Sequence, residues 1–207
     1  RDFIAFLESN DDLVRVSEPV SPKLEMTEIQ TRVMAEGGPA ILFENVVDDN
    51  GDSYGMPMLV NLFGTVDRVA QGMNRNREGL REIGETLAFL RQPEPPGGWR
   101  EALDMMPLVK TVMAMKPKTV NSAPCQDIVL TGDDIDLSKL PIQSCWPGEP
   151  GPLITWPLVV TKGPQADEKS GDKRDDYNLG IYRMQVTGKN TTLMRWLKHR
   201  GGAQHHA

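Results

Sequence analysis

Apolar residues in the first half of the chain recur at spacings typical of helices and strands. Phe3, Ile4 and Leu7 share one helical face, which predicts a short amphipathic helix at 2–9. Strands are predicted at 13–16, 40–46 and 58–62, and helices between Ser21 and Gly37 and at 66–73, 79–90 and 99–115. This mixture predicts a small α/β or α+β unit.

The ends of the second predicted helix are marked by Ser21–Pro22 and Gly37–Gly38. Serine can cap a helix and proline fits its first turn, whereas glycine commonly follows the last turn. The helix at 99–115 contains several methionines. We interpret them as residues that fill the core rather than as a binding face.

After Lys116 the apolar runs become shorter and turns separate them. They cover 127–130, 153–160, 179–186 and 191–197. This spacing predicts a β-rich second domain, so we divide the chain into domains at 1–118 and 119–207 and predict the α+β fold class overall. The charged segment 164–176 is predicted to be a solvated, hairpin-like loop.

Composition and charge narrow the classes of function. A length of 207 residues, 39% apolar and 25% charged, fits a globular protein with a substantial core. A net charge of −6 argues against a general nucleic-acid-binding protein. Apolar runs are shorter than the ~18–20 residues of a membrane span. Cys125 and Cys145 lack the spacing of a metal or disulfide motif, so we expect reduced thiols in a cytoplasmic protein.

Hydrogen-bonding and ligating side chains concentrate near the end of the chain, between 176 and 206. Such groups are rarely buried without partners, so their concentration predicts a site for an anionic or metal-bound ligand. The residues concerned are Asn178, Arg183, Arg195, Trp196, Lys198, His199, Arg200 and Gly201–Gly202.

Asn178 and Arg183 each allow two interpretations. The Asn178 amide oxygen suits a hard cation such as Mn²⁺ or Mg²⁺, but asparagine is also common at strand ends. The Arg183 guanidinium suits a phosphate or carboxylate, or it is an exposed strand cation. Strict alternation puts the two residues on opposite faces of a strand, so both reach one site only if the strand bends, which Gly180 would permit.

The segment 195–202 suits a phosphorylated, ring-bearing cofactor, because arginines flank a tryptophan and two glycines allow close backbone approach. His199 is either a metal ligand or proton carrier, or an ordinary surface residue. Adjacent residues point apart, so we interpret His205–His206 as a frayed terminus.

Taken together, the motifs resemble the UbiD family of decarboxylases over nearly the whole chain. Within the family the chain is most similar to the members that decarboxylate 4-hydroxy-3-polyprenylbenzoate in ubiquinone biosynthesis. The two most specific motifs are NLGIYRMQ from Asn178 and MRWLKHRGGA from Met194. The other matching segments are GGPAILFENV from Gly37, NLFGT from Asn61, LAFLRQPEPP from Leu87, APCQ from Ala123 and LPIQSCWPGEPGPLITWPLVVTKGP from Leu140.

The resemblance implies a prenylated FMN cofactor bound with Mn²⁺, often with K⁺ as well. It implies an N-terminal α/β domain followed by the start of a split β-barrel that resembles flavin reductases. The metal-binding asparagine of the family falls on Asn178, a metal-ligating histidine of some members falls on His199, and the arginine of the catalytic charge network falls on Arg183. Cofactor contacts fall on Ile181, Tyr182, Arg183, Arg195, Trp196, Leu197, Arg200 and Gly201.

The same resemblance implies a reaction and its partners. The reaction is non-oxidative loss of CO₂ from a polyprenylated aromatic acid, in a homo-oligomer that receives its cofactor from a flavin prenyltransferase. The family's catalytic acid and carboxylate metal ligand fall beyond Ala207, so we expect a longer protein. The alternative is a non-catalytic flavin- or phosphate-binding module, or a subunit that another chain completes. Contact with the membrane surface through the lipid-tailed substrate stays open.

Overall fold

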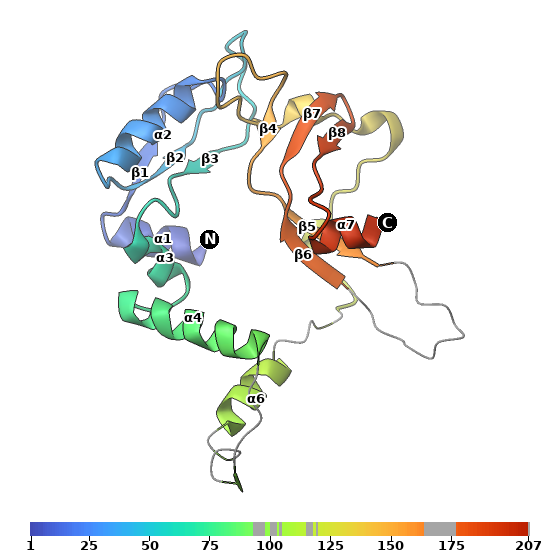
Figure 1. Ribbon diagram of the computed structural model, residues 1–207. Helices are drawn as coiled ribbons and strands as arrows, with labels where there is room; N and C mark the ends of the chain where they lie inside the picture. Colours follow the sequence, from blue (N-terminus) through green and yellow to red (C-terminus); the bar gives the residue numbers. More distant parts are fainter. Residues whose placement is uncertain are drawn as a thin grey trace. The chain divides into compact units, whose positions relative to one another are not determined.

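The computed structural model describes residues 1–92, 98–99, 103, 105–114, 118, 120–163 and 177–206 (Figure 1). The predicted loop at 164–176 and part of the predicted helix at 99–115 lie outside these residues. The chain divides into two compact units: Arg1–Thr65 together with Gly132–Ala207, and Val66–Thr131. Helices alternate with small sheets, which agrees with the predicted α+β class.

A three-stranded sheet near the start of the chain holds the core of the first unit. Its strands are β1 (Leu13–Val16), β2 (Ala40–Phe43) and β3 (Met58–Val60). The central strand β2 runs parallel to β1 and antiparallel to β3. All four residues of β2 are buried, which explains why its sequence is uninterrupted by polar residues.

The two faces of β2 contribute to different apolar clusters. Ile41 and Phe43 pack with residues that include Met26 of α2 (Glu25–Ala35). Ala40 and Leu42 point the other way and pack with residues that include Leu7 of α1 (Asp2–Ser9). Because a helix covers each face of the central strand, β2 is buried between α1 and α2, whereas Val14 and Arg15 of β1 are exposed.

The helix α2 begins later than its sequence suggests. We expected it to begin at Ser21–Pro22, but the first helical residue is Glu25. Leu24 adopts a positive φ of 67°, so the chain makes a turn before it enters the helix. Ser21 still binds the helix start, because its backbone N–H donates to the Glu25 carboxylate at 2.8 Å. The predicted stop is confirmed, since α2 ends at Ala35 and Gly37 has a φ of 66°.

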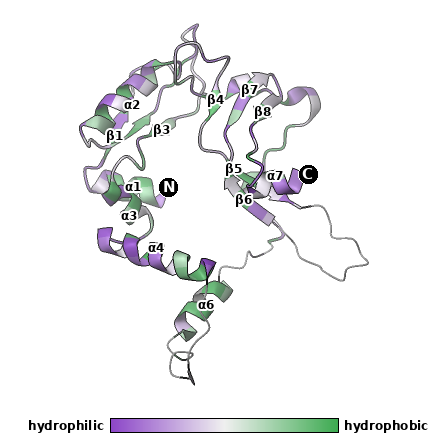
Figure 2. Ribbon diagram, viewed as in Figure 1, coloured by the Kyte–Doolittle hydropathy of each residue, from purple (hydrophilic) through white to green (hydrophobic). Residues whose placement is uncertain are grey.

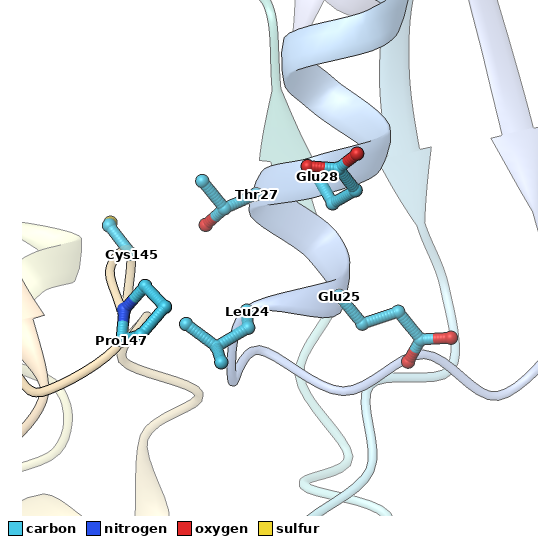
Figure 3. Close-up of a pocket in the computed structure, with 6 residues that line it drawn as sticks. All are labelled: Leu24, Glu25, Thr27, Glu28, Cys145 and Pro147. Atoms are coloured by element: carbon cyan, nitrogen blue, oxygen red, sulfur yellow. The ribbon is translucent and has the colours of Figure 1, made fainter.

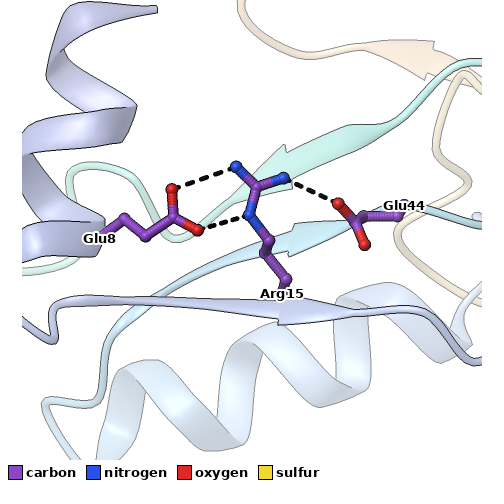
Figure 4. Close-up of polar contacts among 3 residues, drawn as sticks. All are labelled: Glu8, Arg15 and Glu44. Carbon is purple, nitrogen blue, oxygen red and sulfur yellow. Dashed lines mark hydrogen bonds and ion pairs between the residues drawn. The ribbon is translucent and has the colours of Figure 1, made fainter.

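One arginine links α1, β1 and the residue after β2 (Figure 4). Arg15 Nε donates to Glu8 Oε1 at 2.6 Å, and Arg15 Nη1 donates to Glu44 Oε1 at 2.7 Å. The hydrogen bond from Arg15 holds the pKa of the Glu8 carboxyl below its ordinary value. The side chains are about two fifths exposed, so water screens the attraction.

We expect Arg15→Ala to lower the melting temperature modestly at pH 7. Since the pKa of Glu8 is lower in the folded chain, this carboxylate stabilises the fold above its unfolded pKa and loses that effect as the pH falls through its folded pKa. The difference from wild type should therefore shrink in acid, as measured by thermal unfolding between pH 7 and pH 2. Arg32→Ala, which removes an exposed pair with Glu28 within one helix, is the control. A difference of equal size at both ends of this range contradicts the account.

The described residues of the second unit are mostly helical as far as Ala114. It contains α3 (Val66–Gly72), α4 (Arg77–Arg91) and α6 (Met106–Ala114). Asn76 caps α4 by accepting a hydrogen bond from the Gly79 N–H. The strand expected at 127–130 is absent from the described residues: Ile128 and Val129 are 82% and 72% exposed and have no strand partner. The apolar run does not form a strand because no neighbouring strand pairs with it.

The helix α6 is largely hydrophobic, as Figure 2 shows, yet its apolar side chains are not in a core. Met106 and Met113 are 46% and 68% exposed, so our interpretation of these methionines as core residues is wrong for this structure. Composition identified the apolar side chains, but whether they are covered depends on what packs against the helix.

The second half of the first unit consists of short strands and one terminal helix. The strands β4 (Leu153–Ile154), β7 (Met184–Gly188) and β8 (Thr191–Met194) form one antiparallel sheet. The strands β5 (Leu158–Lys162) and β6 (Tyr177–Ile181) form a second antiparallel pair, and α7 (Gly201–His206) packs on it. One-turn 3₁₀ helices occupy Gly132–Asp134 and Leu137–Lys139 in this unit, and Pro124–Gln126 in the second unit.

Two of the predicted strands are each divided in the structure. The apolar run at 153–160 is interrupted before Leu158 by Trp156 and Pro157, and the run at 179–186 is interrupted by Tyr182 and Arg183. The strand expected at 191–197 ends early, at Met194. Each interruption moves the chain from one small sheet to the other, which periodicity alone does not reveal.

Candidate functional site

The centre of the predicted site lies on the strand pair β5–β6. The register places Asn178 opposite Thr161 and Gly180 opposite Val159. Residues alternate between the faces of a strand, so Asn178 and Gly180 share a face with their partners. That face is half-buried and lies against α7, which runs beside β5 and β6 in Figure 1.

The amide of Asn178 is held by two hydroxyl groups. Its Nδ2 donates to Thr161 Oγ1 at 3.3 Å and to the Tyr182 hydroxyl at 3.1 Å. The Tyr182 oxygen also accepts the backbone N–H of Gly202 at 2.9 Å. The amide nitrogen is therefore directed toward the hydroxyls, which leaves the amide oxygen Oδ1 on the opposite side of the group.

Three glycines make room for this arrangement. A Cβ atom at Gly180 would lie 2.5 Å from Cε2 of Tyr182, and one at Gly201 would lie 2.3 Å from Asn178 Oδ1. A Cβ at Gly202 would lie 1.7 Å from Cζ3 of Trp196. Each glycine thus allows a backbone segment to approach a side chain of the site more closely than any other residue could.

Tyr182 and Trp196 form an aromatic pair beside Asn178. Their ring centroids are 4.7 Å apart and their planes are inclined by 53°. This geometry is within the range that aromatic pairs prefer. Both rings are half-buried, so the pair fixes the position of the Tyr182 hydroxyl that accepts the Asn178 amide.

The strand does not bend at Gly180, the residue that we identified as one that would permit a bend. The strand β6 keeps an unbroken register with β5 from Tyr177 to Ile181. The chain instead leaves the sheet at Tyr182 and Arg183, before β7 begins at Met184. Gly180 contributes space for the Tyr182 ring rather than a bulge.

The structure brings four of the predicted site residues together and leaves the others on the surface. Asn178, Tyr182, Trp196 and Gly201 form the cluster described above. Among the described residues, the three arginines of the site form no ion pair. The exposed residues are Ile181, Arg183, Arg195, Leu197, His199 and Arg200.

Arg183 lies close enough to Cys145 for its charge to act on the thiol. Burial is the main cause that raises the pKa of Cys145 above its ordinary value, and the positive charge of Arg183 acts in the opposite direction. Both cysteines are free, as the sequence predicts. Cys145 is therefore a largely protonated thiol at neutral pH rather than a reactive thiolate.

Two residues of the cluster were missed by reasoning from the sequence. Thr161 lies in another motif, and only the register of β5 with β6 places it opposite Asn178. His205 was interpreted as part of a frayed terminus, which is wrong: it is half-buried in α7, and its Nδ1 lies 2.9 Å from Thr161 Oγ1. The available signal was that His205 lies one helical turn after Gly201, so the two residues share a face of a helix.

The donor set at Asn178 fits a hard cation. Amide oxygen is a neutral ligand of the kind that Mn²⁺ and Mg²⁺ accept, and Oδ1 accepts no hydrogen bond from another described residue. In the described part of the chain, no three His, Cys, Asp or Glu side chains gather into a metal site. Asn178 can therefore supply one ligand, and further ligands are needed to complete a site.

Two surface hollows occur elsewhere. One, of about 340 Å³, lies between the start of α2 and the Cys145–Pro147 turn (Figure 3). It is lined by Leu24, Glu25, Thr27, Glu28, Cys145 and Pro147. The other, of about 360 Å³, lies in the second unit between α3 and α4. Neither hollow is lined by residues of the predicted site.

Among the described residues, no helix combines the length and the apolar character that crossing a membrane requires.

Two sequence models of one family match the chain. The N-terminal domain of 3-octaprenyl-4-hydroxybenzoate carboxy-lyase (UbiD) matches residues 4–87, and the Rift-related domain of the same enzyme matches residues 118–207. The second match contains every residue of the candidate site.

Solved structures give the same relationship. The UbiD-class enzyme HmfF from Pelotomaculum thermopropionicum, in complex with FMN, is 26% identical with a TM-score of 0.67 over 95% of this chain. An evolved dimeric form of HmfF with prFMN is 25% identical with a TM-score of 0.70 over 99% of this chain. Vanillic acid decarboxylase from Sedimentibacter hydroxybenzoicus, at 20% identity and a TM-score of 0.70, shares the fold over 99% of this chain.

The chain spans only part of these proteins: 36% and 39% of the two HmfF chains and 38% of the decarboxylase chain. With both family models matched and these structures alike over nearly its whole length, the chain belongs to the UbiD family of carboxy-lyases.

Proposed function

We propose that the full-length protein decarboxylates 4-hydroxy-3-polyprenylbenzoate to 2-polyprenylphenol in ubiquinone biosynthesis, using prenylated FMN. The observation that carries the proposal is the Asn178 amide, held by Thr161 and Tyr182 within the NLGIYRMQ motif so that its oxygen is free to bind a cation. The matched family models, which describe a polyprenyl-hydroxybenzoate carboxy-lyase, and the complexes of HmfF with FMN and prFMN support it.

Loss of CO₂ from an aromatic ring carbon leaves an electron pair that the ring cannot hold. Prenylated FMN, when bound, supplies a place for that pair. The contribution of the chain is to position the aromatic acid that is the substrate. Arg183 is exposed and forms no ion pair with another described residue, so its guanidinium is available to bind the carboxylate in a two-pronged hydrogen-bonded pair.

We propose that charged and aromatic side chains of the segments that contain Asn178 and Gly201 bind the flavin phosphate and a metal ion. Asn178 Oδ1 and His199 would bind Mn²⁺, with K⁺ as an additional ion, and Arg195 and Arg200 would neutralise the phosphate. Each arginine is exposed and can reorient toward an anion without first breaking an ion pair to another described residue. Trp196 together with Tyr182 offers a flat apolar wall for a ring system.

An exposed apolar face on β5–β6 supports the proposal that these strands begin a split β-barrel. Leu158, Val160, Leu179 and Ile181 are 70%, 62%, 65% and 51% exposed and lie on the face opposite Asn178. Neighbouring apolar side chains of this size are normally covered. We propose that further strands of the longer protein cover them, and that the domains divide at 1–118 and 119–207, which the two family-model matches support.

Leu179→Lys tests whether this face is covered. In the full-length protein the substitution should lower the free energy of unfolding by about 2–5 kcal/mol, because it places an unpaired charge in a buried layer. In the 1–207 piece, where Leu179 is 65% exposed, the change should be small. Thermal and denaturant unfolding of both forms provides the measurement, with Ile128→Lys as an exposed control. Equal effects in both forms would show that nothing covers the face.

The remaining parts of the proposal concern assembly and location. We propose a homo-oligomer in the cytoplasm that receives its cofactor from a flavin prenyltransferase and meets its lipid-tailed substrate at the membrane surface. A dimeric form of HmfF supports an oligomer, and two free cysteines are compatible with a reducing compartment.

The test is CO₂ release by the full-length protein, loaded with prenylated FMN and Mn²⁺, from four acids: 4-hydroxy-3-polyprenylbenzoate, 4-hydroxybenzoate, vanillic acid and 3,4-dihydroxybenzoic acid. Preference for the prenylated acid is expected. Turnover of the small acids alone would contradict the proposed substrate but not the reaction. Tight binding of the flavin without turnover of any acid would favour the alternative, a non-catalytic flavin-binding module or a subunit that another chain completes.

A further inference from the structure

We infer that Thr161, Tyr182 and His205 position the Asn178 amide, so that its oxygen rather than its nitrogen faces the metal ion. We call these four residues the Asn178 network. The inference rests on the proposed function, in which Asn178 binds Mn²⁺. It assigns a role to two side chains, Thr161 and His205, that lie outside the predicted site, and a hydrogen-bonding role to Tyr182.

An asparagine side chain can ligate a cation through only one of its two ends. The oxygen has lone pairs, whereas the nitrogen carries two N–H groups and repels a cation. Half a turn about the last side-chain bond exchanges the two ends with almost no change in shape. A metal-binding asparagine therefore needs partners that distinguish nitrogen from oxygen.

In the structure, two hydroxyl oxygens of the Asn178 network accept hydrogen bonds from the nitrogen end of the amide. Nδ2 has two hydrogens and two oxygen neighbours, Thr161 Oγ1 at 3.3 Å and the Tyr182 hydroxyl at 3.1 Å. The nitrogen thus uses both hydrogens inside the chain. Oδ1 is left beside the backbone of Gly201, where a Cβ atom would lie only 2.3 Å from it.

The hydroxyl of Tyr182 is itself fixed by a group that can only donate. The backbone N–H of Gly202 lies 2.9 Å from the Tyr182 oxygen, which must therefore act as an acceptor there. Packing of the ring against Trp196 at 4.7 Å restricts its movement further. The oxygen has a second lone pair, and Nδ2 of Asn178 occupies that direction.

Thr161 is fixed in a similar way from the other side. Its oxygen accepts a hydrogen bond from the Asn178 amide, and His205 Nδ1 lies 2.9 Å from the same oxygen. A hydroxyl group has one hydrogen and two lone pairs, so Thr161 can donate to this ring nitrogen or accept from it, according to the tautomer of His205. Strand β5, strand β6, the residue after β6 and helix α7 thus each contribute one side chain to the orientation of one amide.

The experiment measures Mn²⁺ binding directly, by the electron paramagnetic resonance signal of free Mn²⁺ titrated with full-length protein lacking cofactor. Asn178→Ala should abolish or greatly weaken binding. Thr161→Val, Tyr182→Phe and His205→Ala should each raise the Kd by roughly 10–100-fold, the usual effect of removing a group that orients a metal ligand.

Matched variants control for folding and for general loss of polar groups. Thr161→Ser keeps the hydroxyl and should retain the wild-type Kd. Thr187→Val and His206→Ala change exposed residues of the same types, and Tyr177→Phe changes a tyrosine on the opposite face of β6; all three should leave the Kd unchanged. Near-ultraviolet circular dichroism checks that each variant has folded.

The outcomes separate this inference from the proposed function. If Asn178→Ala weakens Mn²⁺ binding while Thr161→Val, Tyr182→Phe and His205→Ala leave the Kd unchanged, the inference alone is overturned. Wild-type affinity in Asn178→Ala would overturn the proposed metal role, and the inference with it. Wild-type affinity in Thr161→Val together with weaker binding in Thr161→Ser would show that the methyl group of Thr161, and not its hydroxyl, is what matters.

Discussion

Replacing Arg183 with alanine in the full-length protein should lower kcat/KM for decarboxylation by on the order of 10²–10³-fold, the usual effect of removing one positioned charge-stabilising group. The guanidinium is exposed and has no ion-pair partner among the described residues, so its binding capacity is available to the substrate carboxylate. The value of kcat/KM is obtained from steady-state measurement of CO₂ release with prenylated FMN and Mn²⁺ present.

Two further variants make this prediction specific. Arg183→Lys keeps the charge but loses the planar fork, so it should recover only part of the rate. Arg81→Ala removes an exposed arginine from α4, away from any proposed role, and should leave the rate unchanged. Undiminished turnover in Arg183→Ala would refute the role of this residue while leaving family membership untouched.

A single added methyl group at Gly202 should disrupt the site by packing alone. Its Cβ would lie 1.7 Å from Cζ3 of Trp196, so the ring or the start of α7 has to move. We expect Gly202→Ala to lower the free energy of unfolding by about 1–3 kcal/mol. Because the Gly202 N–H also binds Tyr182, the variant should weaken Mn²⁺ binding as well.

Gly84→Ala is the matched control for this substitution. Gly84 lies within α4, and an added Cβ there would meet no atom within 4 Å. Alanine is a better helix former, so this variant should be more stable by about 0.5–1 kcal/mol. Chemical denaturation of both variants and their near-ultraviolet circular dichroism, to which Trp196 contributes, provide the comparison. A Gly202→Ala protein as stable as wild type would show that the helix is not packed on Trp196.

Reasoning from local pattern succeeded where neighbours along the chain determine the structure. The helix α1 follows from the spacing of Phe3, Ile4 and Leu7, and the stop after α2 follows from Gly37. The burial of β2 follows from an apolar run that is too short for a helix. In each case the interactions that determine the structure join residues that are close in sequence or that share one buried face.

Prediction failed where distant segments decide. Periodicity does not show that Ser21 precedes a turn instead of a helix, because the turn is bonded to a distant residue: the Leu24 N–H donates to the Ser144 carbonyl, and the Ser144 N–H donates to the Pro22 carbonyl. Thr161 and His205 could not be assigned to the site from their neighbours in sequence, since the β5–β6 register and the packing of α7 bring them to Asn178. Gly180 was identified as a residue that would permit a bend, but in the structure it provides space for the Tyr182 ring.

The central claim is that Asn178 Oδ1 binds the divalent ion that accompanies the flavin phosphate. It is tested most directly by anomalous X-ray diffraction from crystals of the full-length protein soaked with Mn²⁺ and prenylated FMN. We predict a manganese peak within coordination distance of Oδ1, roughly 2.0–2.6 Å for oxygen ligands of hard divalent cations, with Nδ2 still bound to Thr161 and Tyr182. A manganese peak remote from Asn178, or an amide turned with its nitrogen toward the ion, would contradict the account.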